Sequence, residues 1–133
     1  MKKLRIGFSP CPNDTFIFDA LIHGKIDCEG LEFELYMADV EELNRMALQG
    51  ELDITKLSYH AYLHVLETYI MMDSGSALGT NCGPLLIKNS RAENPRTTDL
   101  IAIPGKYTTA NFLLNFAFPD LQNKKEILFS EIE

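Results

Sequence analysis

Three absences in the 133-residue sequence narrow the class of protein. No apolar run approaches the roughly 20 residues that cross a bilayer, and the basic start at Lys2 and Lys3 is followed by turn residues instead of a signal-peptide core. Basic residues are few, 12 against 19 acidic ones, which argues against nucleic acid as a partner. The three cysteines form no CxxC pair, so reduced thiols are expected. These absences predict a cytoplasmic protein with neither a membrane nor a nucleic-acid partner.

Motifs for metals and nucleotides are also missing. The sequence contains no HExxH, no GxGxxG and no GxxxxGKS/T. His60 and His64 are four residues apart and would share one face of a helix, where two imidazoles could bind a metal. Because no acidic or cysteine partner is evident beside them, a metal site is not favoured. We expect no metal and no organic cofactor.

The composition is that of a globular protein, with 46% hydrophobic and 23% charged residues. Segments with strand and helix periodicity alternate along the chain, which predicts an α/β fold with parallel strands and helices on the faces of the sheet. Such sheets bind ligands beyond the C-terminal ends of their strands. The expected strands are 4–8, 31–36, 52–57, 69–72, 84–88, 100–103 and 127–129, and the expected helices are 14–22, 40–49, 58–67 and 108–117.

Capping residues indicate where these helices begin and end. Asp39 and Glu42 have the spacing of a capping box in which Asp replaces Ser or Thr. The expected N-terminal caps are Asn13 or Asp14, Asp39, Ser58, and Thr108 or Thr109, and the expected C-terminal residues are Gly24 and Gly50.

Polar segments suggest how the chain is organised. Residues 88–98 contain a proline and predict a linker or an exposed loop. Ser130 and Glu133 are spaced as a capping box for a helix that has no residues, which indicates a chain that stops where a longer one would continue. A frayed polar tail is the alternative. The acidic run between Asp27 and Asp53, which includes Glu41, is most simply a solvated face.

Strand-to-helix turns supply the candidate site residues, and each has a plain structural alternative. At residues 9–15 a helix N-terminus favours an anionic group, and Cys11 could be a nucleophile. Alternatively, residues 13–15 only cap the helix and Cys11 packs as a small apolar residue. Near the sheet edge, Lys56 could offer charge to a carboxylate beside Ser58; alternatively, Ser58 is a plain cap and Lys56 lies in solvent.

Two further turns could contact a ligand. Residues 105–111 place the hydroxyls of Thr108 and Thr109 at a helix start, which suits an anion or a hydroxyl group. Residues 74–83 are mostly small, so a ligand could approach the backbone closely. Alternatively, they form a tight structural loop.

Residues 9–18, SPCPNDTFIF, closely resemble the opening segment of the 1,4-dihydroxy-6-naphthoate synthase family, which belongs to the futalosine route to menaquinone. Further segments match that family in order: TKLSY at 55–59, SGSALG at 74–79 with CGPL at 82–85, and PGKYTTA at 104–110. The matches run from residue 4 to about residue 118, nearly the whole chain.

The resemblance implies a two-lobe α/β fold like that of the periplasmic binding proteins, with a ligand cleft between the lobes. Residues 1–88 would form most of lobe one, 89–98 the linker or hinge region, and 99–133 the start of a truncated lobe two. It implies a lyase that converts cyclic dehypoxanthine futalosine, a small-molecule substrate, to 1,4-dihydroxy-6-naphthoate. The substrate contacts it implies are Ser58, Thr109 and Ala110, with Thr108 in the same turn, and Asn13 and Asp14 near the cleft.

The sequence departs from the family at its end. The base histidine proposed for the family lies in a His-Glu motif after the helix that Ser130 would begin, hence beyond Glu133, and none of the three histidines matches it. The catalytic residue is therefore unknown, and we expect impaired or absent synthase activity from these 133 residues. The alternatives are a non-catalytic binding protein for small carboxylates and a chorismate dehydratase of the same fold, which residues 9–18 argue against.

Overall fold

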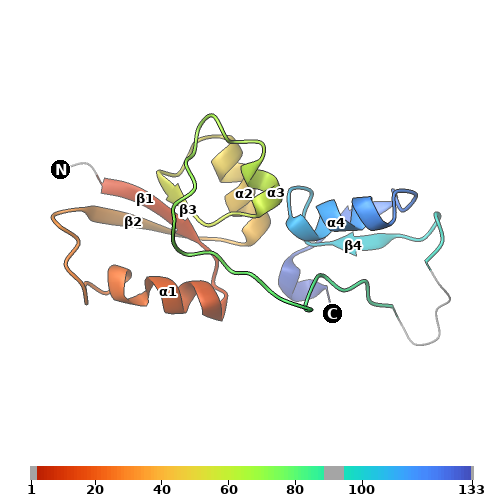
Figure 1. Cartoon of the computed structure of the whole chain (residues 1–133), viewed down its shortest axis with the longest axis horizontal. Coiled ribbons are helices and arrows are strands. Elements are labelled where there is room, and N and C mark those ends of the chain that lie inside the picture. Colours follow the sequence, from red (N-terminus) through yellow and green to blue (C-terminus); the bar gives the residue numbers. More distant parts are fainter. Residues whose placement is uncertain (1–2, 89–94, 133) are drawn as a thin grey trace.

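The chain forms two sheets of parallel strands, and residues 70–88 run from the first toward the second without joining either (Figure 1). The structure is a computed structural model and describes residues 3–88 and 95–132. Three strands in the order β2-β1-β3 make the N-terminal sheet, and β4 and β5 make the C-terminal sheet. All strand pairs are parallel, so the α/β class predicted from the sequence is confirmed.

The N-terminal sheet has β1 at its centre. β2 pairs with β1 along its whole length, whereas β3 pairs with only two of its residues. One helix, α1, lies on one face of the sheet, and α2 and α3 lie on the other (Figure 1). In chain order the elements are β1 (Lys3–Phe8), α1 (Pro12–Ile22), β2 (Glu32–Met37), α2 (Val40–Leu48), β3 (Ile54–Thr55) and α3 (Tyr59–Tyr62).

The face of the sheet beneath α2 holds a tightly filled core. Leu43 and Ala47 of α2 are each 1% exposed, and Leu52 is 3% exposed. A Cβ atom at Gly7 would lie 2.5 Å from Leu52 Cδ1 and 2.9 Å from Leu43 Cδ2. Only glycine therefore lets α2 and the segment before β3 approach β1 this closely.

The opposite face is covered less completely by α1. Phe8 stacks on Phe18 of α1 with ring centroids 4.6 Å apart. No residue of α1 is fully buried, and Phe16 is 85% exposed. A cavity of about 520 Å³ lies between the C-terminal end of α1 and β2. The apolar face predicted for residues 31–36 is accordingly only partly covered, with Leu35 38% exposed.

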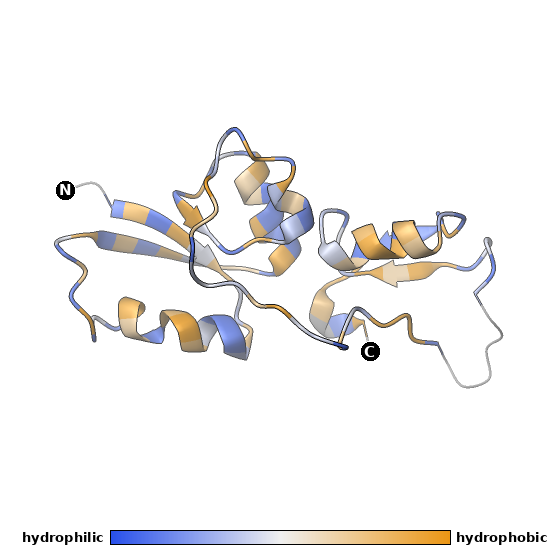
Figure 2. Cartoon of the chain, viewed as in Figure 1, coloured by the Kyte–Doolittle hydropathy of each residue, from blue (hydrophilic) through white to orange (hydrophobic). Residues whose placement is uncertain are grey.

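The C-terminal sheet is smaller and carries one helix. Ile103 and Leu121 are its buried apolar residues, each 5% exposed. Figure 2 shows apolar residues along both α4 and β4. None of the helices in the two described ranges has the length and apolar character that a membrane crossing needs. The elements are β4 (Ile101–Ile103), α4 (Thr109–Ala117), β5 (Lys124–Glu126) and a 3₁₀ turn, η1 (Phe129–Glu131).

Most predicted elements are present. The strands expected at 4–8, 31–36 and 100–103 and the helices expected at 14–22, 40–49 and 108–117 are confirmed to within two residues. The strand expected at 52–57 is reduced to β3, and the helix expected at 58–67 is reduced to α3. After α3, the amides of His64 and Val65 bond to carbonyls three residues back, so the chain leaves the α-helical path there.

Three predicted strands are wrong. Every residue from 70 to 88 is exposed, Tyr69 just before them is only partly buried, and no strand of the described chain pairs with either segment, 69–72 or 84–88. An apolar run becomes a strand only when a neighbour satisfies its backbone groups. The strand expected at 127–129 lies earlier in the chain, as β5. The last hydrogen bond between β5 and β4 joins the Ile127 amide to the Ile103 carbonyl, and the pairing ends there.

The predicted cap of α1 is also wrong. The helix begins after Cys11, with Pro12 at its first position, where a missing N–H has no cost. Asn13 and Asp14 therefore lie inside the first turn. The Asp14 carboxylate instead accepts hydrogen bonds from the Ser9 amide and hydroxyl, at 3.1 and 2.8 Å.

The remaining caps follow the sequence more closely. Asp39 caps α2 by accepting from the Val40 amide at 2.6 Å, and Thr108 caps α4 by accepting from the Asn111 amide at 3.3 Å. Gly24 and Gly50 follow the ends of α1 and α2 with positive φ angles of 61° and 68°. Ser58 occupies the N-cap position of α3, but its side chain makes no capping bond.

Two predictions fall near residues that the structure does not describe. The linker predicted at 89–98 is described only from residue 95, and its residues 89–94 lie outside the described ranges. The helix predicted to begin at Ser130 is represented by the single turn η1, whose N-cap is Leu128. Glu133 lies outside the described residues, so a longer helix there stays a prediction.

Candidate functional site

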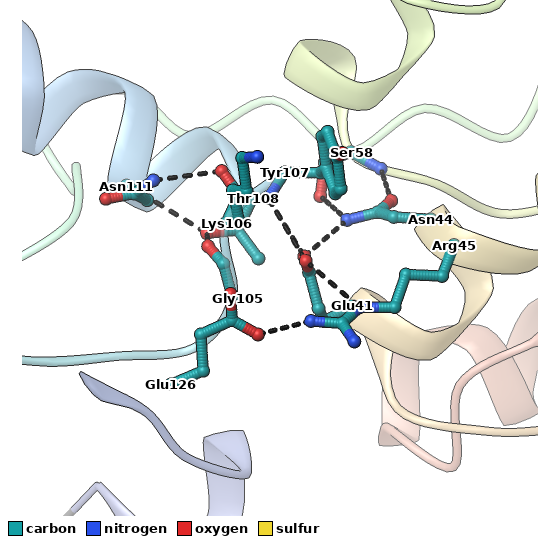
Figure 3. A network of polar contacts seen from close by, with 10 residues as sticks. All are labelled: Glu41, Asn44, Arg45, Ser58, Gly105, Lys106, Tyr107, Thr108, Asn111 and Glu126. Carbon is teal, nitrogen blue, oxygen red and sulfur yellow. Dashed lines mark hydrogen bonds and ion pairs between the residues drawn. The ribbon is translucent and has the colours of Figure 1, made fainter. Parts of the chain in front are cut away.

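Polar side chains gather where α2 meets the loop between β4 and α4 (Figure 3). Glu41 is 7% exposed, and its carboxylate accepts hydrogen bonds from the Tyr107 amide at 3.2 Å for Oε1 and 3.1 Å for Oε2. We call this region the sheet junction; it consists of Glu41, Asn44, Ser58, Gly105 and Tyr107. Glu41 is therefore not on a solvated face, and the sequence interpretation of that residue is wrong.

Asn44 is the centre of the sheet junction. It is 0% exposed and lies one helical turn after Glu41, on the same side of α2. Its Nδ2 donates to Glu41 Oε2 at 3.3 Å and to Ser58 Oγ at 3.2 Å, and its Oδ1 accepts from the Ser58 amide at 2.9 Å. One buried amide thus connects α2 with the turn that precedes α3 (Figure 3).

Gly105 lets the two parts of the sheet junction meet. A Cβ atom at this position would lie 2.3 Å from the Cδ and Oε2 atoms of Glu41. The backbone of the β4–α4 loop therefore comes against the carboxylate where no side chain intervenes. On the outer side of α2, Arg45 lies 3.6 Å from Glu41 and also forms an ion pair with Glu126 of β5.

Thr108 has little capacity left for a ligand. It is 4% exposed, its hydroxyl donates to the Gly105 carbonyl at 2.8 Å, and its oxygen accepts from the Asn111 amide. Asn111 in turn donates to the Lys106 carbonyl at 2.9 Å, so two carbonyls of the β4–α4 loop are hydrogen-bonded to side chains at the start of α4. Thr109 and Ala110 are the first residues of α4, partly exposed, in a turn whose amides have no partner within the helix.

A second polar cluster surrounds Lys56. Its Nζ donates to the Gly75 carbonyl at 2.7 Å and lies 4.0 Å from the Asp14 carboxylate. Next to it, the hydroxyls of Tyr59 and Ser76 lie 2.5 Å apart. Lys56 is 26% exposed, so the alternative that placed it in solvent is wrong. Three of the turns that the sequence analysis singled out, near residues 14, 56 and 75, thus meet in this cluster.

Some predicted residues remain apart from both groups. Asn13 is exposed on the first turn of α1. Cys11 is an exposed free thiol, so it does not pack as a small apolar residue. All three cysteines are free in the structure.

The two neighbouring histidines face the C-terminal part of the chain. The ring of His60 lies 5.0 Å from that of Phe112, and the ring of His64 lies 5.7 Å from that of Tyr107. The two imidazoles are 5.2 Å apart in an edge-to-face arrangement. In the described ranges no group of three or more histidine, cysteine, aspartate or glutamate side chains is placed to hold a metal ion. The contact of His60 with Phe112 joins α3 to α4, and that of His64 with Tyr107 joins the residues that flank these helices.

Sequence reasoning proposed Ser58 and Thr108 as site residues and did not propose Glu41 or Asn44, which the structure places beside them. The Tyr107 amide, which donates to Glu41, is 66 residues away from it, and no local pattern reveals that contact. The signal that could have found them is spacing, because Glu41 and Asn44 are three residues apart and lie beside the apolar stripe formed by Leu43 and Ala47.

These features define the class of protein: parallel α/β sheets with polar residues at the turns that follow their strands. The chain belongs to the menaquinone biosynthesis family, whose model matches residues 4–132. The expected membership is thereby confirmed.

Individual relatives support this membership. The chain is 49% identical over 115 residues to a protein of Thermus thermophilus and 40% identical over 110 residues to one of Streptomyces coelicolor, both named 1,4-dihydroxy-6-naphtoate synthase. The aligned regions cover 86% and 83% of this chain but 42% and 38% of the relatives. The chain therefore spans less than half the length of the curated relatives it matches.

A solved structure shares the fold. An X-ray crystal structure of a protein from Archaeoglobus fulgidus is similar, with a TM-score of 0.85 at 37% sequence identity. The similarity covers 98% of this chain and 48% of that protein. Nearly all of the chain thus has a counterpart in one experimentally determined fold.

Proposed function

We propose that this chain carries the N-terminal part of a 1,4-dihydroxy-6-naphthoate synthase. The complete enzyme would act in the cytoplasm as a lyase, converting cyclic dehypoxanthine futalosine to 1,4-dihydroxy-6-naphthoate in menaquinone biosynthesis. The names of the two curated relatives, together with the family match over residues 4–132, support the reaction.

One observation of the structure carries the proposal. Ser58 and the turn that starts α4 follow strands of different sheets, yet the buried side chains of Asn44 and Glu41 connect them through hydrogen bonds. A small anionic group at the sheet junction could therefore contact the Ser58 hydroxyl and the first amides of α4, at Thr109 and Ala110. Helix N-termini attract carboxylates without basic side chains, which is compatible with a net charge of -7.

The rest of the proposed arrangement follows the family. The two sheets would belong to two lobes of a periplasmic-binding-protein-like fold, with the division at residues 89–98 and the substrate between the lobes. Asn13, Asp14 and Thr108 would shape the walls of the site. For Asp14 and Thr108 the hydrogen bonds within their own loops support a shaping role.

The first test is binding to the 133-residue chain. Isothermal titration with 1,4-dihydroxy-6-naphthoate should detect a complex, and the 6-carboxamide analogue should bind more weakly because helix amides favour negative charge. Turnover of cyclic dehypoxanthine futalosine by the chain alone is not expected, since none of its histidines matches the family's base. Absence of any complex would contradict the proposal.

The second test separates an enzyme from a non-catalytic binding protein. In a hybrid, residues 4–118 of this chain would replace the matched part of the Thermus thermophilus relative. Release of 1,4-dihydroxy-6-naphthoate by the hybrid supports the synthase. A folded hybrid that binds the substrate without forming product would favour the binding protein instead.

A further inference from the structure

Ser58 occupies a capping position without capping. A serine at the N-cap of a helix normally accepts a hydrogen bond from an amide of the first turn. The Ser58 side chain makes no such bond and is turned toward α2, where its Oγ accepts from Asn44 Nδ2 at 3.2 Å. The Ser58 hydroxyl therefore does not cap α3.

The neighbours of Asn44 determine which way its amide faces. The Ser58 amide can only donate, so the Asn44 atom 2.9 Å from it must be the oxygen. The Glu41 carboxylate accepts, so the atom 3.3 Å from Glu41 Oε2 must be the NH₂ group. Both requirements are met by one orientation, and this orientation also directs an N–H at the Ser58 hydroxyl oxygen.

The consequence concerns the hydrogen of the Ser58 hydroxyl. Because the oxygen accepts from Asn44, its own hydrogen points elsewhere, and the hydroxyl donates no hydrogen bond to the described residues. Thr108 differs, since its hydroxyl already donates to the Gly105 carbonyl. Of these two hydroxyls at the proposed site, only that of Ser58 has a free donor.

We propose that Asn44, itself held by Glu41, is a positioning residue that turns the Ser58 hydroxyl into a hydrogen-bond donor for the carboxylate of the ligand. This inference rests on the proposed function for the identity of the ligand. The inference adds that two buried residues of α2 strengthen the preference for a carboxylate over an uncharged group, in addition to the amides at the start of α4.

Titration of the full 133-residue chain with 1,4-dihydroxy-6-naphthoate and its 6-carboxamide tests the proposal. Ser58→Ala should weaken carboxylate binding about tenfold, the loss expected for one hydrogen bond to a charged group. Asn44→Asp should have a similar effect, because an aspartate oxygen would accept the Ser58 hydrogen instead of donating to its oxygen. Asn123→Asp is the matched control, because Asn123 is exposed and the variant should bind the carboxylate with unchanged affinity.

Two comparisons distinguish positioning from a structural role. If Asn44 acts through Ser58, the double variant S58A/N44D should bind no more weakly than S58A, and both single variants should show a smaller preference for carboxylate over carboxamide than the unaltered chain. Ser58→Thr restores the hydroxyl and should bind normally, but not when combined with Asn44→Asp. Additive losses, or an unchanged carboxylate preference in N44D, would overturn the inference.

The remaining outcomes are also decisive. Asn44→Ser is the second variant if N44D fails to fold by circular dichroism, and unfolding of both would show that Asn44 serves the fold alone. Normal carboxylate binding by the unaltered chain together with unchanged N44D selectivity would overturn this inference and leave the proposed function standing. Absence of binding by the unaltered chain would overturn the proposed function, and this inference with it.

Discussion

The helices on the two faces of the N-terminal sheet differ in burial, and the more apolar helix is the less buried one. α1 is rich in apolar residues yet has none that is fully buried, whereas the more polar α2 has four buried residues. Leu43 and Ala47 of α2 face the sheet, while Glu41 and Asn44 face the β4–α4 loop and the Ser58 turn. α2 is therefore enclosed on two sides, whereas α1 packs on the sheet and reaches a further neighbour through the ion pair between Asp14 and Lys56.

The difference teaches that burial follows the number of neighbours more closely than apolar content. A helix with apolar residues all round is normally enclosed on more than one side. α1 leaves Phe16 and Ile17 85% and 45% exposed because only the sheet is packed against it in the described chain. α2 can bury a carboxylate and an amide because each finds hydrogen-bond partners.

The comparison is tested most strongly by truncating one side chain on each helix. Leu43→Ala in α2 should destabilise the chain by about 2–5 kcal/mol, because it leaves a cavity in a filled core. Phe16→Ala in α1 should change the stability by no more than about 0.5 kcal/mol, because that ring is already in water. Urea denaturation followed by circular dichroism measures both, and equal losses would contradict the contrast.

The next largest effect is expected where α2 meets the C-terminal part. Gly105→Ala places a Cβ 2.3 Å from a carboxylate that Tyr107 and Asn44 hold in place, so we expect a loss of about 1–3 kcal/mol. Gly83→Ala is the control, because a Cβ there has no atom within 4 Å. The same denaturation measurement applies. A G105A variant as stable as the unaltered chain would show that Glu41 can move away from the added Cβ at little cost.

Neutralising one carboxylate should have a smaller effect. Glu41→Gln retains the shape of the side chain but weakens its hydrogen bonds from the Tyr107 amide and its pair with Arg45, at a cost of about 1–2 kcal/mol. Glu42→Gln, on the exposed side of the same helix, is the matched control. If both substitutions have the same effect, the buried position of Glu41 has no special role.

The smallest expected effect sharpens the comparison at the edge of the α2 core. The Tyr69 hydroxyl donates to the Leu52 carbonyl at 2.6 Å, and Tyr69→Phe should cost about 1 kcal/mol. Tyr36→Phe, with its hydroxyl in an exposed bond to Glu34, should cost less.

Alkaline pH offers a second measurement of the same contact. Burial raises the pKa of Tyr69, so its stabilising contribution is complete below about pH 10 and is lost as the pH rises through the raised value. The urea midpoint of unfolding should therefore fall further for the unaltered chain than for Y69F when the pH is raised from below to above that value. An equal fall would show that Tyr69 does not report on this core.

Sequence patterns predicted the elements whose stability is local. Period-2 and helical spacing identified β1, β2, β4 and the three longer helices, and the caps at Asp39 and Thr108 follow from side-chain chemistry alone. Ser58 was also placed correctly at the start of α3, and Thr108 at the start of α4.

What the sequence could not supply are contacts made at a distance. Glu41 resembled any acidic surface residue, because the amide that it accepts from belongs to Tyr107. The apolar runs at 69–72 and 84–88 resembled strands, because apolar content does not reveal whether a partner strand is present. The turn role of Asp14 was missed because proline at position 12 set the helix start earlier.

The sheet junction also has a consequence for the order in which the chain folds. Glu41 and Tyr107 are 66 residues apart, and Arg45 and Glu126 are 81 apart. Closing such long loops has a higher entropic cost than pairing β1 with β2, and contacts of large sequence separation slow folding. The N-terminal sheet should therefore form first, and the docking of the C-terminal sheet against α2 should be the slow, late step.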